Sequence, residues 1–264
     1  MIVFVGCSFT WGSGLQYEYL YENGWSVDEI NKVLPFNYHL EQLSYDADEY
    51  RKKHNWPNLV AKELNKPFVI GTYTNGGSNL TTTLPALDCL NHISRAYSIT
   101  TIVVQFTSWV RDVEDDDNFK LKFPFNGSRK NLDSTQQDFM NEQILSQIKQ
   151  IEKCCKDIQS HEDLEYGHMN NRDKFPSWFG LSWQEDLGSV LKEYYPENFI
   201  PIHFEGNTYN SFEPITPPGF NEYDSLDKPG LRICDTIPGV KDTHLNSKGC
   251  KVVAKSIIKK LKQY

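Results

Sequence analysis

Short apolar segments alternate with longer helix-like segments along most of this chain, and this alternation constrains the fold more than any other feature. The clearest strand is the β-branched, apolar run at residues 100–106, and an apolar run at residues 2–6 ends at Gly6. The predicted strands are residues 2–6, 68–70, 100–106, 199–202 and 231–233. The predicted helices are residues 57–64, 80–95, 136–158, 183–194 and 246–262, with a further short helix near residues 26–33. This order predicts an α/β fold with a mostly parallel, five-stranded sheet covered by helices on both faces.

The length and composition suit one large domain. The chain has 264 residues, of which 39% are hydrophobic, so it can bury a sizeable core. The sequence holds no internal repeat and no stretch composed like a domain linker, which predicts a single domain over residues 1–264. Residues 112–134 are acidic and then rich in Pro, Gly, Ser and Asn, and residues 161–180 are polar and irregular. We therefore expect a large insertion around residues 112–180.

Charge and cysteine usage argue against several classes of protein. The net charge of -8 gives no positive footprint for nucleic acid, and no apolar run reaches the roughly 18 residues that a membrane helix needs. The apolar start lacks a basic flank and a cleavage site, so we interpret it as a strand and expect a cytoplasmic protein. The six cysteines show no CxxC spacing, which favours reduced thiols. We expect neither a metal nor a cofactor.

Ser8 lies in a turn-rich segment directly after the first predicted strand. A serine hydroxyl is a weak nucleophile until a base takes its proton, and a turn between a strand and a helix can present it at the sheet edge. The glycines that flank the segment, Gly6 and Gly12, leave room for a substrate. The alternative interpretation is a serine that caps the N-terminus of a helix.

His244 lies just before the last predicted helix and is the natural base for such a serine. An imidazole titrates near neutral pH, so it can take the serine proton and return it to the leaving group. Asp242 is placed to orient the ring through its other nitrogen. The alternative is an aspartate that caps local structure beside a surface histidine.

Three motifs in this order resemble the SGNH (GDSL-like) hydrolase family. They are Gly6-Cys7-Ser8-Phe9-Thr10-Trp11-Gly12, then Asn75-Gly76-Gly77-Ser78-Asn79, and finally Asp242-Thr243-His244-Leu245-Asn246-Ser247-Lys248-Gly249. The segment Asn55-Trp56-Pro57, which leads into a helix, is also similar to this group. The motifs bracket nearly the whole chain but occupy only a small part of it.

The resemblance implies a three-layer α/β/α sandwich of flavodoxin-like type and a Ser-His-Asp triad formed by Ser8, His244 and Asp242. It implies action on esters, often acyl groups on carbohydrates or lipids. It also implies an oxyanion hole made by the serine's own N–H, a glycine of the second motif and an asparagine that follows the third strand. Gly77, Ser78 and Asn79 are the candidates in the second motif.

The chain departs from the family pattern at four places. Cys7 stands where the family usually has Asp, and Asn79 stands where the oxyanion glycine falls if Ser78 is aligned. No asparagine follows the third strand, so Thr107, Ser108 and Arg111 are the candidate groups for an oxyanion or the substrate. The aspartate precedes the histidine by two residues rather than three, which leaves Asp235 as an alternative acid. These departures are similar to those of divergent SGNH-like proteins of tailed bacteriophages.

The main hypothesis is therefore a serine ester hydrolase that removes acetyl or acyl groups from a carbohydrate or another small, polar ester. The first alternative is a binding or structural protein on the same scaffold with little or no hydrolysis, such as a virion component, because the motif after the third strand is altered. A second alternative is acyl transfer to an acceptor other than water. A more remote one is a nucleotide-binding protein, for which the phosphate-binding fingerprint is missing.

Overall fold

The structure, a computed structural model, describes residues 1–33, 45–72, 83–93, 99–106, 134–165, 178–182, 199–201, 240 and 244–263. Its strands are β1 (Ile2–Gly6), β2 (Phe68–Thr72), β3 (Thr101–Gln105), β4 (Trp178–Ser182) and β5 (Phe199–Pro201). Its helices are α1 (Ser8–Trp11), α2 (Gly14–Glu22), α3 (Val27–Val33), α5 (Tyr45–His54), α6 (Trp56–Leu64), α7 (Leu84–Ile93), α10 (Ser134–Glu165) and α12 (Ser247–Leu261).

The strands pair in parallel, and β1 lies between β2 and β3. Val5 of β1 lies opposite Gly71 of β2 on one side and opposite Val104 of β3 on the other. β4 pairs with β3, and β5 with β4, also in parallel, which gives the order β2-β1-β3-β4-β5. The prediction of a mixed α/β fold with a parallel sheet is thereby confirmed.

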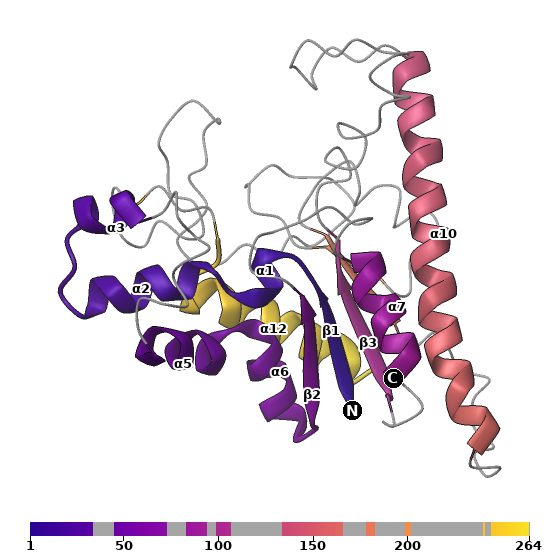
Figure 1. The fold of residues 1–264 in the computed structure, drawn as a ribbon, viewed down its shortest axis with the longest axis horizontal. Coiled ribbons are helices and arrows are strands. Elements are labelled where there is room, and N and C mark those ends of the chain that lie inside the picture. Colours follow the sequence, from indigo (N-terminus) through magenta and orange to yellow (C-terminus); the bar gives the residue numbers. More distant parts are fainter. Residues whose placement is uncertain are drawn as a thin grey trace.

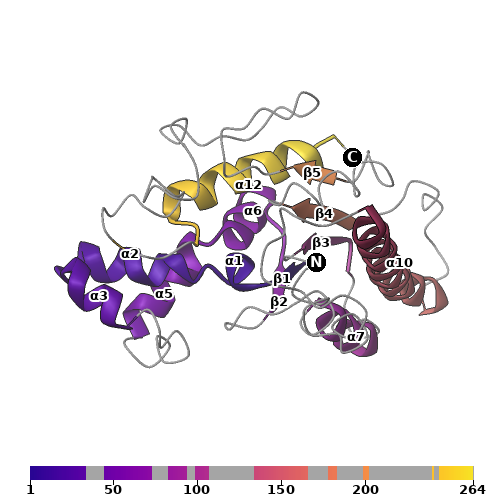
Figure 2. The ribbon, with the colours of Figure 1, turned by 90° about the horizontal axis from the view of Figure 1, so that it is seen from above.

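Separate apolar clusters cover the two faces of the sheet, because successive side chains of a strand point to opposite faces. Val3 and Val5 of β1 pack in one cluster with side chains of α7 and α10. Ile2 and Phe4 pack in the other with side chains of α6 and α12. Figure 2 shows α6 and α12 on one side of the sheet and α7 and α10 on the other. All four β1 side chains are almost fully buried, and each contributes roughly 1.5–3 kcal/mol.

A lateral group of helices extends from the sheet beside this core. α2, α3 and α5 lie together at the left of Figure 1, and an apolar cluster joins α2, α3 and Val240 through Tyr17, Leu20 and Ile30. Of these helices only α3 matches a predicted one, because the region around residues 17–50 has weak periodicity and we expected one short helix there. α2 and α5 correct that expectation. Helix α5 of this group carries a side chain that binds α1, the helix that follows β1.

Two further expectations differ from the structure. β4 falls at residues 178–182, where we predicted no strand. A strand of only five residues that follows an irregular, polar stretch gives a weak sequence signal. α10 runs to Glu165 and buries Ile148 and Ile151 against the sheet, so part of the predicted insertion contributes to the core. The predicted helix at 183–194 and strand at 231–233 lie outside the described residues. The single-domain organisation stays a prediction.

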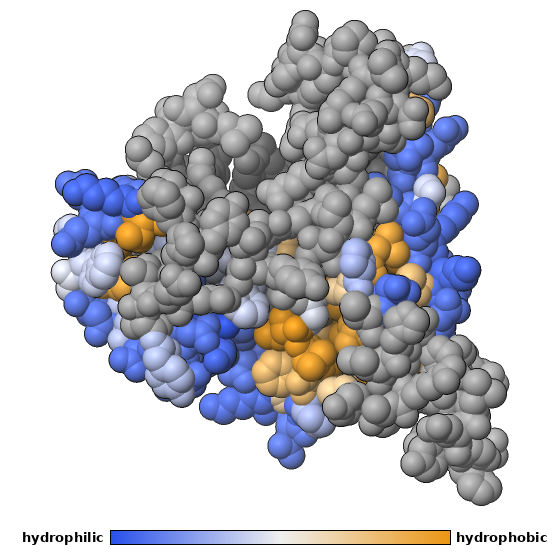
Figure 3. Space-filling model, in the orientation of Figure 1, coloured by the Kyte–Doolittle hydropathy of each residue, from blue (hydrophilic) through white to orange (hydrophobic). Residues whose placement is uncertain are grey.

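On the face of the molecule that Figure 3 shows, hydrophilic and apolar residues gather in different places. In Figure 3, hydrophilic residues cover α10 and much of the lateral helices, while apolar residues gather near the middle of this face. Among the helices that the structure describes, none combines the length and the apolar character needed to cross a membrane.

Candidate active site

The carboxyl ends of β1 and β3 lie where the order of the sheet reverses. From β1 the chain passes through α6 to β2 on one side, and from β2 through α7 to β3 on the other. In open α/β sheets the ligand binds at such a point, outside the carboxyl ends of the strands. Ser8 follows β1 by two residues, and Gln105 is the last residue of β3. Figure 1 shows α1, which carries Ser8, at this end of β1.

The structure brings Ser8 and His244 together. His244 Nε2 lies 2.7 Å from Ser8 Oγ, although 236 residues separate the two along the chain. Ser8 is 8% exposed and His244 is half-buried, so the pair lies at the edge of the core and not within it. The ring of Phe9 lies 4.9 Å from the imidazole, centroid to centroid, and limits how far the imidazole can tilt on that side.

This geometry argues against the structural interpretations of both residues. The N-cap of α1 is Cys7, and its side chain makes no capping bond, while the Ser8 hydroxyl bonds to the histidine. The N-cap of α12 is Asn246, whose Oδ1 accepts a hydrogen bond of 2.9 Å from the Gly249 N–H. An imidazole whose Nε2 accepts from the serine hydroxyl can take its proton, which is the arrangement that activates a serine.

Side chains at the start of α6 hold the carbonyl groups of α1. Asn55 caps α6 by accepting from the Asn58 N–H at 3.0 Å, and its Nδ2 lies 3.5 Å from the Trp11 carbonyl oxygen. Trp56 Nε1 donates to the Phe9 carbonyl at 3.1 Å. Asn55 and Trp56 are at most 1% exposed. The Asn-Trp-Pro segment that the sequence singled out therefore ties the serine's helix to α6.

Arg51 of α5 holds the same helix from a second direction. Its Nη1 donates to the Trp11 carbonyl at 2.8 Å, and its guanidinium lies 3.5 Å from the centroid of the Trp11 ring. Asp48 accepts from Arg51 Nε at 3.0 Å and from Nη2 at 2.7 Å. Arg51 is 1% exposed, so these contacts replace the water that the guanidinium gives up.

Gly12 ends α1 in a conformation that other residues rarely adopt. Its φ is +90°, in the left-handed region, and its N–H donates to the Ser8 carbonyl at 2.9 Å. A Cβ at this position would lie 3.0 Å from Asn55 Cβ and 3.0 Å from Leu15 Cδ1. Both the backbone angle and the close approach therefore favour glycine at the end of this short helix.

Glu18 of α2 holds the segment that carries His244. Its two carboxylate oxygens accept from the Ser247 N–H at 2.7 Å and from the Ser247 hydroxyl at 2.8 Å. Burial raises the pKa of the Glu18 carboxyl above its ordinary value, and the two bonds from Ser247 oppose that shift. A carboxylate at the first turn of α12 also complements the helix dipole. Glu18 and Asn246 together fix the start of α12, two or three residues after the histidine.

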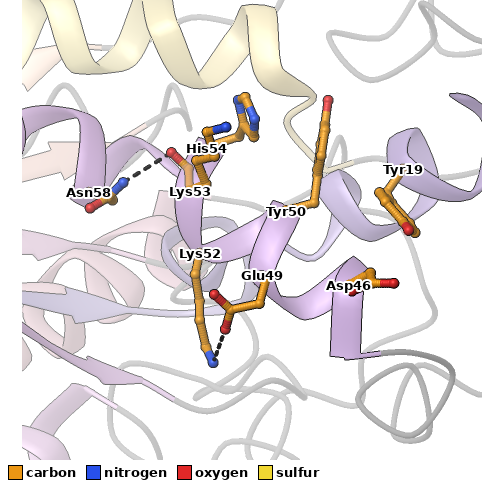
Figure 4. Close-up of a pocket in the computed structure, with 8 residues that line it drawn as sticks. All are labelled: Tyr19, Asp46, Glu49, Tyr50, Lys52, Lys53, His54 and Asn58. Carbon is orange, nitrogen blue, oxygen red and sulfur yellow. Dashed lines mark hydrogen bonds and ion pairs between the residues drawn. The ribbon is translucent and has the colours of Figure 1, made fainter.

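A separate groove of about 620 Å³ lies on the lateral helices (Figure 4). Its lining residues are Tyr19, Asp46, Glu49, Tyr50, Lys52, Lys53, His54 and Asn58. The Tyr50 ring lies 5.6 Å from that of Tyr19 and stacks on His54 at 4.3 Å. Lys52 pairs with Glu49 at 3.2 Å. Neither Ser8 nor His244 lines this groove, so we assign it no part in their chemistry.

The other predicted site residues lie outside the described part of the chain. These are Asp242, Gly77, Ser78, Asn79, Thr107, Ser108 and Arg111. Within the described ranges, no group of three or more His, Cys, Asp or Glu side chains is arranged to hold a metal ion. The sequence reasoning did not single out Glu18, Arg51 or Gln105 as site residues.

In comparisons with protein-family models, curated proteins and solved structures, nothing matches this chain.

Proposed function

We propose that this chain is a serine ester hydrolase in which Ser8 is the nucleophile and His244 the base. The observation that carries the proposal is the 2.7 Å contact between Ser8 Oγ and His244 Nε2. The two residues come from opposite ends of the chain, and each lies next to the terminus of a helix that other side chains hold in place. Such preorganisation is expected of a reacting pair, because it lowers the entropy that must be lost during the reaction.

The fold supports this proposal. The parallel order β2-β1-β3-β4-β5 is that of flavodoxin-like doubly wound sheets, with Ser8 at the carboxyl end of β1. We therefore propose the five-stranded, three-layer α/β/α sandwich that the resemblance to SGNH hydrolases implies.

The reaction would proceed in two steps. Ser8 Oγ attacks the ester carbonyl carbon while His244 Nε2 takes the hydroxyl proton, and the imidazolium then protonates the leaving alcohol. Water, activated by the same imidazole, hydrolyses the acyl-serine and restores the enzyme. In this proposal Asp242 orients the imidazole.

The negative charge that develops on the substrate oxygen needs hydrogen-bond donors. We assign this role to the Ser8 N–H and to the second motif, with Gly77, Ser78 and Asn79. Thr107, Ser108 and Arg111 take the place of the family's asparagine in binding the oxyanion or substrate. One such donor typically contributes on the order of 100- to 1000-fold in rate.

The proposed substrate is a small or glycan ester, cleaved without a cofactor. The second candidate, a binding or structural protein on this scaffold, is favoured by the altered motif after β3, where Thr107 and Ser108 replace the family's Gly-x-Asn-Asp pattern. A cytoplasmic location and a place in a virion both stay predictions.

Hydrolysis of p-nitrophenyl acetate by purified protein tests the proposal. Ser8→Ala and His244→Ala should each lower kcat by roughly 10⁴- to 10⁶-fold, with no loss of folding. Ser256→Ala is the matched control, because within the described part of the chain this serine hydroxyl donates to the Val252 carbonyl of its own helix α12, and its loss should leave kcat unchanged. Wild-type turnover in Ser8→Ala would exclude this nucleophile. A folded but inactive wild type would favour the binding protein.

A further inference from the structure

We infer that Gln105 is a positioning residue that fixes the serine-bearing turn to the neighbouring strand, an inference that rests on the proposed function. Gln105 ends β3, and its side chain is fully buried. The β1–β3 pairing ends with Val5 opposite Val104, and Gly6 and Gln105 follow directly in their strands, with Gln105 Cβ only 2.8 Å from where a Cβ on Gly6 would lie. The glutamine therefore lies beside β1 at the point where the chain turns toward Ser8.

Three groups of the turn converge on one oxygen of this side chain. Gln105 Oε1 accepts from the Cys7 N–H at 3.0 Å, from Cys7 Sγ at 3.0 Å and from Thr10 Oγ1 at 3.1 Å. Cys7 and Thr10 flank the nucleophile and are at most 3% exposed. The glutamine thus binds the turn on both sides of Ser8 without touching the serine hydroxyl itself.

The chemistry of the neighbours fixes the orientation of the amide. Gln105 Nε2 donates to the Phe106 carbonyl at 2.6 Å, while Oε1 faces the three donors. Rotating the amide by half a turn would set its NH₂ against the Cys7 N–H and its oxygen against the Phe106 carbonyl. Because a backbone N–H cannot turn away, only one orientation satisfies all four groups.

A buried N–H that precedes the nucleophile needs such a partner. Backbone N–H groups in protein interiors are almost always hydrogen-bonded, and Cys7 supplies no side-chain cap to α1. Gln105 therefore supplies through its side chain a hydrogen bond to the residue just beyond the end of β1. Removing this acceptor would break the hydrogen bond of the buried Cys7 N–H, or allow the turn to shift until the N–H finds water.

The space around Gly6 shows independently that the turn packs closely against Gln105. A Cβ on Gly6 would collide with Thr10 Oγ1 and would lie 2.8 Å from both Cβ and Oε1 of Gln105. The glycine that opens the first motif is thus required by the same close approach that lets Gln105 reach the turn. Gly6 has no side chain and so leaves the space at the end of β1 that the Gln105 side chain occupies. Gln105 in turn supplies the hydrogen-bond acceptor for the turn.

A shift of the turn would act on the chemical step more than on binding. Catalytic geometry tolerates little displacement, and a misplacement of about 1 Å can lower a rate on the order of 100-fold. Gln105→Met removes the acceptor at similar volume, and we expect kcat to fall on the order of 10- to 100-fold while KM stays nearly constant. Gln105→Glu, as the neutral acid that full burial favours, keeps an accepting oxygen toward the turn and an O–H that can donate to the Phe106 carbonyl, and we expect it to recover most of that loss.

The experiment combines kcat and KM for p-nitrophenyl acetate with amide hydrogen exchange at Cys7. Gln147→Met is the matched control, because Gln147 is a buried glutamine on α10, on the opposite side of the sheet from α6 and α12. We expect Gln105→Met to speed exchange of the Cys7 amide on the order of tenfold and to lower kcat. Neither change should appear in Gln147→Met, and Gln105→Glu should lie close to wild type.

The outcomes separate this inference from the proposed function. Wild-type kcat and wild-type Cys7 exchange in folded Gln105→Met would overturn the positioning role while leaving the hydrolase intact. An inactive wild type would overturn the hydrolase, and Cys7 exchange would still test whether Gln105 holds the turn. If Gln105→Met does not fold, Gln105→Asn replaces it, because its shorter side chain withdraws the oxygen from the turn and should lower kcat in the same way.

Discussion

The two halves of the proposed catalytic pair, Ser8 and His244, are held by different means. The turn that carries Ser8 is tied on several sides by side chains that are almost fully buried: Gln105 of β3, Trp56 of α6 and Arg51 of α5. The segment that carries His244 is fixed from its C-terminal side by Asn246 and by the half-buried Glu18. Among the residues that the structure describes, almost fully buried side chains from three elements hold the serine side, while a helix cap and a half-buried carboxylate hold the histidine side.

The two sides also differ in the carboxyl group that supports each of them, because the pKa values of these two groups are shifted in opposite directions. Burial is the largest influence on Asp48, which supports the serine side, but hydrogen bonds from Lys52 and Arg51 outweigh it and lower the pKa of its carboxyl. Burial raises the pKa of Glu18, which supports the histidine side. The two halves of the site should consequently respond to pH with opposite sign.

Arg51→Met should have the largest effect on stability. It removes the partner of the Trp11 carbonyl and leaves the Asp48 carboxylate without its best donor, so we expect a loss of about 3 kcal/mol in the free energy of unfolding. Lys52→Met is the matched control, because Lys52 also pairs with Asp48 but is 55% exposed. Urea denaturation should show a loss of about 0–1 kcal/mol for the control. Equal losses in the two variants would contradict the buried role of Arg51.

Gly6→Ala should have the second-largest effect on stability. The added methyl group would collide with Thr10 and press on Gln105, and overpacking of this kind costs about 1–3 kcal/mol. Gly71→Ala on β2 is the control, because its Cβ would meet neighbours only at ordinary contact distances of 3.5–3.7 Å. Thermal unfolding should separate the two variants, and a wild-type melting temperature for Gly6→Ala would show that the turn is not tightly packed.

Asn246→Ala should destabilise the histidine side by a smaller amount. It removes the hydrogen bond to the Gly249 N–H at the start of α12, which is worth about 1 kcal/mol. Asn246→Asp keeps an acceptor there and should retain most of that stability. Equilibrium denaturation of both variants measures the difference, and an aspartate variant as unstable as the alanine variant would argue against capping as the reason.

The fold class and the contact between Ser8 and His244 could be predicted from the sequence because their signals are local. The apolar run of β1 and the turn after it are contiguous, and the motifs around Ser8 and His244 are short. The residues that hold the pair carry no such signal. Gln105 and Arg51 act on residues that lie 40 or more positions away, and a polar side chain at the end of a strand or on a helix does not reveal its partner. Glu18 lies on α2, a helix without a clear amphipathic pattern.

The smallest expected changes in the free energy of unfolding are those caused by pH. They test directly whether Glu18 on the histidine side and Asp48 on the serine side respond to pH in opposite directions. The contribution of Glu18 to stability is fully present below its unfolded pKa of about 4.5 and is lost as pH rises through the higher folded value. The contribution of Asp48 is present above its unfolded pKa of about 3.8 and is lost as pH falls through the lower folded value.

Denaturation between acid and neutral pH measures both effects. Relative to Glu18→Gln, the wild type should lose unfolding free energy as pH rises from about 4.5 toward neutrality. Relative to Asp48→Asn, it should gain unfolding free energy as pH rises through the acid range. Differences that move in the same direction with pH would contradict the contrast between the two sides.

The most direct test of the central claim is to map the adduct formed with a fluorophosphonate, which reacts with activated serines. Mass spectrometry of the labelled wild type should show one adduct, located on Ser8, and Ser8→Ala should remain unmodified. Labelling of His244→Ala should be strongly slowed, because the serine then lacks its base. A folded wild type that stays unmodified, or an adduct that persists in Ser8→Ala, would contradict the assignment of Ser8 and His244 as a catalytic pair.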